Sequence, residues 1–119
     1  MRMGRGSVTL LGLLLGSLLA LSASPAPAAD VNELYKLHCL KCHGAEGKGD
    51  GESLKKVKGK AIDWTNKTEM AKLSNQDVFD IIWQGGGGVG KSKIMPVYKG
   101  KLKEEEAKEL AIFVRSFAK

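Results

Sequence analysis

Hydrophobic residues recur at helical spacing in three stretches of the chain, and each stretch predicts a helix. The first begins at Asp30 and carries its apolar face as far as Cys42. The second begins at Ser74, a residue type favoured as a helix cap, with Asp77 at the third helical position, and it ends where four glycines begin at Gly85. The third covers residues 103–119, with three glutamates in its first turn and an apolar stripe along one face.

The weaker patterns between these stretches complete an all-α prediction of about four helices. A short helix is expected over residues 68–73, where Met70 would fill the core. Residues 61–66 look irregular, and Trp64 is their one large apolar side chain. The last helix is expected to cross the first near Leu34 and Tyr35, because both have an apolar face to bury.

The first 28 residues have the composition of a secretory signal peptide. Arg2 and Arg5 precede an apolar run over residues 8–21, and Ala26-Pro27-Ala28 fits a cleavage site of the A-x-A type. The alternative is an uncleaved membrane anchor, but a run of 14 residues is short of the ~18 expected for a membrane-spanning helix. We expect export with cleavage near Ala28.

Cleavage would leave one small domain, residues 29–119. Loss of Arg2 and Arg5 lowers the formal net charge from +6 to +4, which favours an acidic partner or surface. The domain has only three Phe, two Trp and two Tyr to build a core. A bulky apolar prosthetic group would supply the missing buried surface.

The strongest chemical signal is Cys39-Leu40-Lys41-Cys42-His43, which has the C-x-x-C-H spacing that attaches a c-type haem. On a helix the two cysteines and the histidine lie at i, i+3 and i+4, so all three project from one face. Two thiols so placed can form thioether bonds to one porphyrin, and the imidazole beside them becomes an axial ligand of the iron. Both cysteines of the chain belong to this motif.

Three other interpretations of these residues are weaker. A thioredoxin-like redox motif should follow a strand, and none is predicted there. A zinc site that included His38 would need four neighbouring residues of one helical turn to surround a tetrahedral metal. A structural disulfide across so short a loop would add little stability and would leave His43 unexplained.

A second axial ligand is expected from Met95. Met1 and Met3 would leave with the signal peptide, so Met70 and Met95 remain as thioether donors. Met95 lies in a non-helical loop braced by Pro96, which can present a side chain at a fixed angle, whereas Met70 has the position of a core residue.

Residues 85–92 formally match the phosphate-binding loop G-x-x-x-x-G-K-[ST]. That loop must follow a buried strand and begin a helix, whereas here it follows a helix and Pro96 comes soon after. The match is interpreted as chance. The glycines are expected instead to let the backbone pass close to the flat face of the haem.

Taken together, the order of these parts resembles the class I c-type cytochromes, and most of all the small bacterial monohaem periplasmic cytochromes. The resemblance covers the whole of the mature chain, although Lys103 stands where relatives often have a Ser or Thr cap, so the last helix could fray at its start. It implies one covalently attached haem c held by Cys39 and Cys42, with His43 and Met95 as axial iron ligands, inside a cytochrome c-like fold.

The resemblance also implies a function and a location. We expect a soluble periplasmic one-electron carrier, monomeric, that is not an enzyme and binds neither nucleic acid nor ATP. Its redox partners would dock through acidic surfaces on a lysine-rich haem edge. The lysines named for that edge are Lys91, Lys93, Lys99 and Lys101, and a second lysine run at residues 55–60 is either a solvated face or part of the same docking surface.

Two alternatives stay open at this point. A gas- or peroxide-binding haem protein would result if Met95 does not bind the iron or is easily displaced. A haem subunit of a larger oxidoreductase would use the same site within a fixed complex.

Overall fold

The computed structural model describes residues 4, 20–24 and 29–119. Most of the predicted signal peptide, residues 1–28, lies outside the described residues, and its cleavage stays a prediction. Among the helices that the structure describes, none has both the length and the apolar character needed to cross a membrane.

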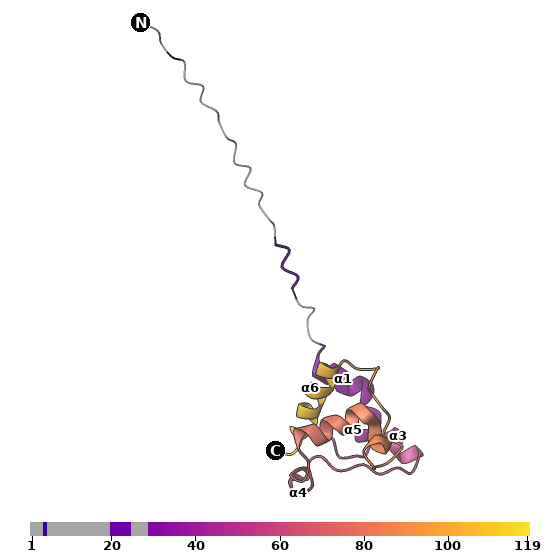
Figure 1. The fold of residues 1–119 in the computed structure, drawn as a ribbon. Helices are drawn as coiled ribbons and strands as arrows, with labels where there is room; N and C mark the ends of the chain where they lie inside the picture. The colour runs from indigo at the N-terminus through magenta and orange to yellow at the C-terminus, as the bar shows by residue number, and fades with distance from the viewer. Residues whose placement is uncertain (1–3, 5–19, 25–28) are drawn as a thin grey trace.

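Helices are the regular elements of residues 29–119, apart from one isolated bridge between Lys99 and Leu102. The all-α prediction is therefore confirmed, although several of the helices are single turns. In chain order the helices are α1 (Val31–His38), α2 (Leu40–His43), α3 (Glu52–Lys56), α4 (Lys67–Met70), α5 (Asn75–Gly88) and α6 (Glu104–Arg115) (Figure 1).

The first predicted helix is interrupted at Cys39, which separates α1 from α2. Helical hydrogen bonding nevertheless continues through the break. The backbone N–H of Cys39 donates to the Tyr35 carbonyl at 2.8 Å, and the N–H of His43 donates to the Cys39 carbonyl at 2.9 Å. The two cysteines and the histidine therefore remain on one helical turn, as their spacing predicts.

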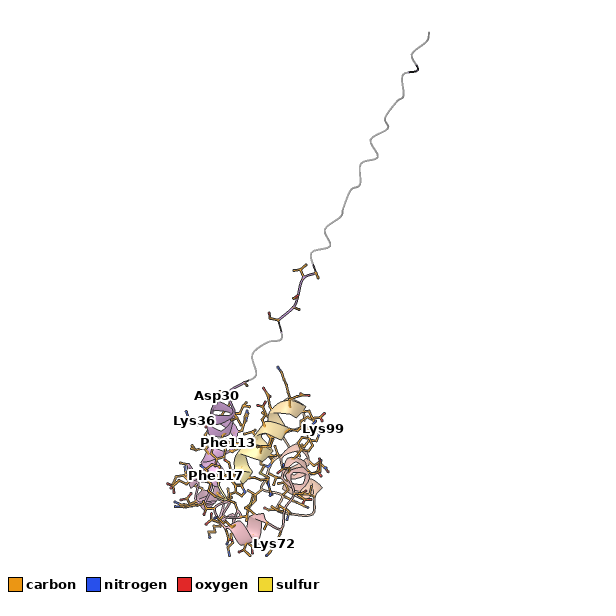
Figure 2. The ribbon with its side chains drawn as sticks, turned by 90° about the vertical axis from the view of Figure 1, so that its left-hand side faces the viewer. Asp30, Lys36, Lys72, Lys99, Phe113 and Phe117 are labelled. Carbon is orange, nitrogen blue, oxygen red and sulfur yellow. The ribbon has the colours of Figure 1, made fainter. Side chains whose placement is uncertain are left out.

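The core forms where α6 packs against α1 and α5 (Figure 1). The Tyr35 ring of α1 packs against Phe113 of α6 and against Phe117 just after that helix, with centroids 5.2 Å and 5.5 Å away. Figure 2 labels both phenylalanines in the region between α6 and α1. Leu110 and Val114 of α6 are almost fully buried. The predicted crossing near Leu34 and Tyr35 is thus confirmed.

Both long helices after α1 begin with backbone groups satisfied by acidic side chains. Ser74 and Asp77 form a complete capping box at α5, as predicted. At α6 the Glu106 carboxylate accepts the backbone N–H of Lys103 at 2.8 Å. The fraying suggested by the lysine at this position is therefore opposed by Glu106, and the helix ends at Arg115 rather than at residue 119.

The glycine run that ends α5 allows a close contact between α5 and the segment that follows it. Regular helix stops before Gly85, whose positive φ of 74° breaks it, and residues 86–88 form one more turn. The N–H of Gly86 donates to the Met95 carbonyl at 3.0 Å. A Cβ on Gly86 would collide with the carbonyl oxygen of Ser92. The glycines thus let residues 91–98, the methionine loop, pack directly onto α5.

This geometry also bears on the formal phosphate-loop match. The element before residues 85–92 is the helix α5, and the backbone after Ser92 is irregular. The backbone N–H of Lys91 donates a hydrogen bond to the Gly86 carbonyl at 2.7 Å, so this N–H is already paired within the turn. A phosphate cradle needs such N–H groups to be free.

Gly86→Ala is expected to loosen the methionine loop. Its Cβ would overlap backbone that cannot move aside, at a cost of about 1–3 kcal/mol. Gly87→Ala is the matched control, because its Cβ would lie 3.3 Å from the flexible Lys93 side chain and meet no closer atom. Alanine there should leave stability unchanged or raise it by roughly 0.5–1 kcal/mol.

Thermal unfolding and amide hydrogen exchange of residues 91–98 measure the two effects. Gly86→Ala should lower the melting temperature and speed exchange in this loop, and Gly87→Ala should do neither. Equal behaviour of the two variants would show that the close packing of Gly86 is unimportant.

Candidate functional site

An apolar cleft lies between α2, the segment 60–64, α5 and the methionine loop. It consists of two adjoining hollows that share Cys39, His43, Lys60 and Met95 in their walls. The larger has a cavity volume of about 300 Å³, at the lower end of the ~300–1,000 Å³ usual for small-molecule and cofactor sites. The walls are mainly aliphatic and aromatic, so the cleft suits a large apolar ligand.

The two cysteines carry free thiols on the wall of this cleft. Cys39 is buried, whereas Cys42 is half-buried. Burial, and to a lesser degree the neighbouring Cys42, raise the pKa of the Cys39 thiol to about 12. The motif follows the helix α1 rather than a strand, which a thioredoxin-like motif would need.

His43 also lines the cleft, and its ring stacks on the indole of Trp64. The centroids are 4.1 Å apart and the planes differ by 15°. Burial lowers the pKa of His43 to about 4, so the imidazole is neutral and one ring nitrogen keeps a free lone pair. Its Nδ1 is buried without a hydrogen-bond partner among the described residues. Trp64 is buried and lines the larger hollow beside His43.

Met95 lies on the methionine loop and lines both hollows together with His43. Besides the bond from Gly86, the backbone N–H of Met95 donates to the Ser92 carbonyl at 3.3 Å. Met70 is only 2 % exposed and belongs to the core cluster, and neither hollow has it in its wall. The structure therefore brings Met95 to the same cleft as Cys39, Cys42 and His43, and keeps Met70 away.

Tyr98 fastens the methionine loop to α1, a role that sequence reasoning missed. Its hydroxyl donates to the His38 carbonyl at 2.7 Å, and burial raises its pKa to about 12, which keeps the donor protonated. The His38 ring packs edge-on against Tyr98 with centroids 5.4 Å apart. The only signal available in the sequence was a large aromatic residue just after Met95-Pro96 among lysines and glycines.

Unpaired lysines border the cleft. Lys60 and Lys91 contribute to the wall of the larger hollow, and Lys93 is exposed on the same loop as Lys91. In the part of the chain that the structure describes, none of these three forms an ion pair. Lys101 lies over the Tyr98 ring, with its Nζ 5.6 Å from the centroid.

Fold and cleft together define a class of protein: a small all-helical domain with an apolar cofactor cleft beside a C-x-x-C-H turn. The family model for cytochrome c matches residues 28–118, and the chain belongs to this family. A solved structure, the KustC0563 c-type cytochrome, is 33% identical, with a TM-score of 0.60. The match covers 76% of this chain and 99% of that one. No significant match is found among curated proteins.

Family membership implies covalently bound haem c and a role in electron transfer. The residues present fit such a group. Two free thiols, a half-buried neutral imidazole and a thioether all border one apolar cleft.

Proposed function

We propose that the protein is a soluble periplasmic carrier of single electrons with one haem c. Cys39 and Cys42 would hold the haem through thioether bonds, and His43 and Met95 would be its axial ligands. The observation that carries the proposal is that these four side chains, from two separate segments, line one apolar cleft.

Each of the four side chains has a separate task. The cysteines, one turn apart, fasten the cofactor to α2, so that it stays with the protein in both oxidation states. His43 offers a neutral nitrogen, and Met95 offers a soft sulfur that favours the reduced metal. When bound, haem iron supplies the redox chemistry by gaining or losing one electron. The apolar walls of the cleft keep water from the haem, and this destabilises the more highly charged oxidised form relative to the reduced form.

The same arrangement argues against catalysis at the metal. Two protein ligands, one from α2 and one from the methionine loop, would occupy both axial positions. Haem enzymes that bind a substrate at iron need one of these positions to be open. The hydrogen bonds that fix the methionine loop at Gly86 and Tyr98 support a ligand that stays in place.

Partner choice is proposed from charge. Lys60, Lys91 and Lys93 lie at or beside the cleft without ion-pair partners among the described residues, so an acidic protein surface would be attracted to the edge where electrons leave. Such docking is weak and salt-sensitive. The periplasmic location rests on the signal-like first 28 residues.

Met95→Ala is expected to open the iron. The ferric protein should lose the weak far-red absorption band of sulfur ligation, and the ferrous protein should bind carbon monoxide more than about tenfold more tightly, an effect of roughly 1.4 kcal/mol or more. Met70→Leu is the matched control and should keep the band, because Met70 is a core residue.

Absorption spectroscopy and carbon monoxide titration measure both effects. Rapid carbon monoxide binding by the unmodified protein, without a far-red band, would favour a gas- or peroxide-binding haem protein. If Met70→Leu loses the far-red band and Met95→Ala keeps it, the iron ligand is Met70 and the assignment of Met95 is wrong.

Lys91→Glu with Lys93→Glu is expected to slow oxidation of the ferrous protein by ferricyanide, an anionic probe. At low ionic strength the loss should be about tenfold or more, because charge at a cleft steers encounters. The control pair, Lys67→Glu with Lys119→Glu, makes the same change in net charge at two exposed residues outside the cleft wall.

Stopped-flow rates at two salt concentrations, and with a cationic cobalt(III) complex as the opposite probe, complete the test. The cleft variant should react faster with the cationic probe, and the differences should shrink at high salt. Equal effects of the two double variants would mean that net charge alone, and not the cleft lysines, steers the encounter.

A further inference from the structure

The imidazole of His43 lacks the polar contact that usually orients a metal-binding histidine. Such a residue normally donates its second ring N–H to a carbonyl or a carboxylate, which fixes the ring and makes the ligand more basic. The Nδ1 of His43 is buried without any partner, and it is the one buried side-chain nitrogen or oxygen in the described residues of which this is true.

Backbone carbonyls at the end of α2 already accept hydrogen bonds from other donors. The loop after α2 turns back and covers the end of the helix with donors. The N–H of Gly49 bonds to the His43 carbonyl at 2.9 Å, and the N–H of Gly51 bonds to the Cys42 carbonyl at 3.0 Å. This close return requires glycine, because a Cβ on Gly51 would collide with the carbonyls of Lys41 and Cys42.

An aromatic contact takes the place of the missing hydrogen bond. The indole of Trp64 stacks on the imidazole at 4.1 Å and 15°. Trp64 also stacks on Phe117, with ring centroids 6.0 Å apart, and it contacts Tyr35 edge-on, with centroids 6.2 Å apart. Its backbone N–H donates to the Gly47 carbonyl at 2.8 Å. The indole is therefore held from several sides, and it lies parallel to His43.

We propose that Trp64 is the positioning residue for the axial histidine: its stacked indole fixes the plane of the His43 ring and keeps water from Nδ1. This inference rests on the proposed role of His43 as an iron ligand. With Nε2 directed to the metal, Nδ1 must carry the proton, and under the indole that proton has no acceptor. A ligand without an acceptor is less basic, which favours the reduced metal, in the same direction as the thioether of Met95.

The test compares three variants of the mature, haem-bearing protein. Trp64→Leu removes the stack, Trp64→Phe keeps an aromatic face, and Phe113→Leu is the control. Phe113 belongs to the same aromatic group and touches Tyr35 and Phe117. It makes no ring contact with His43 or Trp64, so its loss should lower stability without affecting the histidine.

Three measurements follow His43 rather than the fold as a whole. They are solvent exchange of the Nδ1 proton, followed by NMR with ¹⁵N-labelled histidine, the spread of the haem methyl shifts in the ferric protein, and the reduction potential. In Trp64→Leu the proton should exchange at least about tenfold faster, since water reaches it through the opened space. The methyl shifts should change because the ring can turn, and the potential should fall because water becomes an acceptor.

Trp64→Phe should lie between the wild-type protein and Trp64→Leu in all three measurements, and it is the decisive variant if Trp64→Leu fails to fold. Phe113→Leu should match the wild-type protein. Wild-type-like exchange and methyl shifts in either Trp64 variant would overturn the proposal and leave Trp64 as a core residue. Evidence that the Nδ1 proton of His43 is hydrogen-bonded in the wild-type protein would also overturn the proposal.

The wild-type spectra separate this proposal from the proposed function. If the wild-type protein shows no covalent haem or no histidine ligation, the proposed function fails and the inference fails with it. If both are present and the Trp64 variants behave as the wild-type protein does, the inference alone is wrong.

Discussion

The helical turn from Cys39 to His43 is the constraint on which the rest of the structure depends. Two thiols and one imidazole must project from one face, and the hydrogen bonds from Cys39 and His43 to carbonyls one turn earlier hold them there across the break after α1. Because Tyr35, one turn before Cys39, packs against α6, the same helical segment that presents the thiols also anchors the core. Site and fold are therefore built on one short piece of backbone.

The facing wall of the cleft depends on contacts between distant segments. The methionine loop is held to α5 at Gly86, where a side chain would not fit, and to the end of α1 by the Tyr98 hydroxyl. Trp64 closes the base from a third segment and lies parallel to His43. The contacts of Tyr98 with His38 and of Trp64 with His43 join residues far apart in the chain, whereas Gly86 meets a loop that follows it closely. The cleft therefore depends on long-range packing as well as on a local turn.

Local patterns in the sequence were enough for the elements and for the chemistry of the turn. Periodicity predicted the crossing of the first and last helices, Ser74 and Asp77 predicted the start of α5, and the position of Met70 in an apolar pattern predicted its burial. Such patterns did not predict four features of the structure: the break at Cys39, the short α3, the packing of the methionine loop on Gly86 and the role of Tyr98. They result from packing between segments, which a pattern along one segment does not contain.

The proposed function requires a covalent bond between the haem and α2. Intact mass spectrometry of the exported protein, with and without a thiol-alkylating reagent, detects this bond. The expected mass is that of the polypeptide beginning at residue 29 plus one haem, with no alkylation of Cys39 or Cys42. A mass equal to the polypeptide alone, with both cysteines alkylated in protein matured in a host that makes c-type cytochromes, would contradict the proposed function.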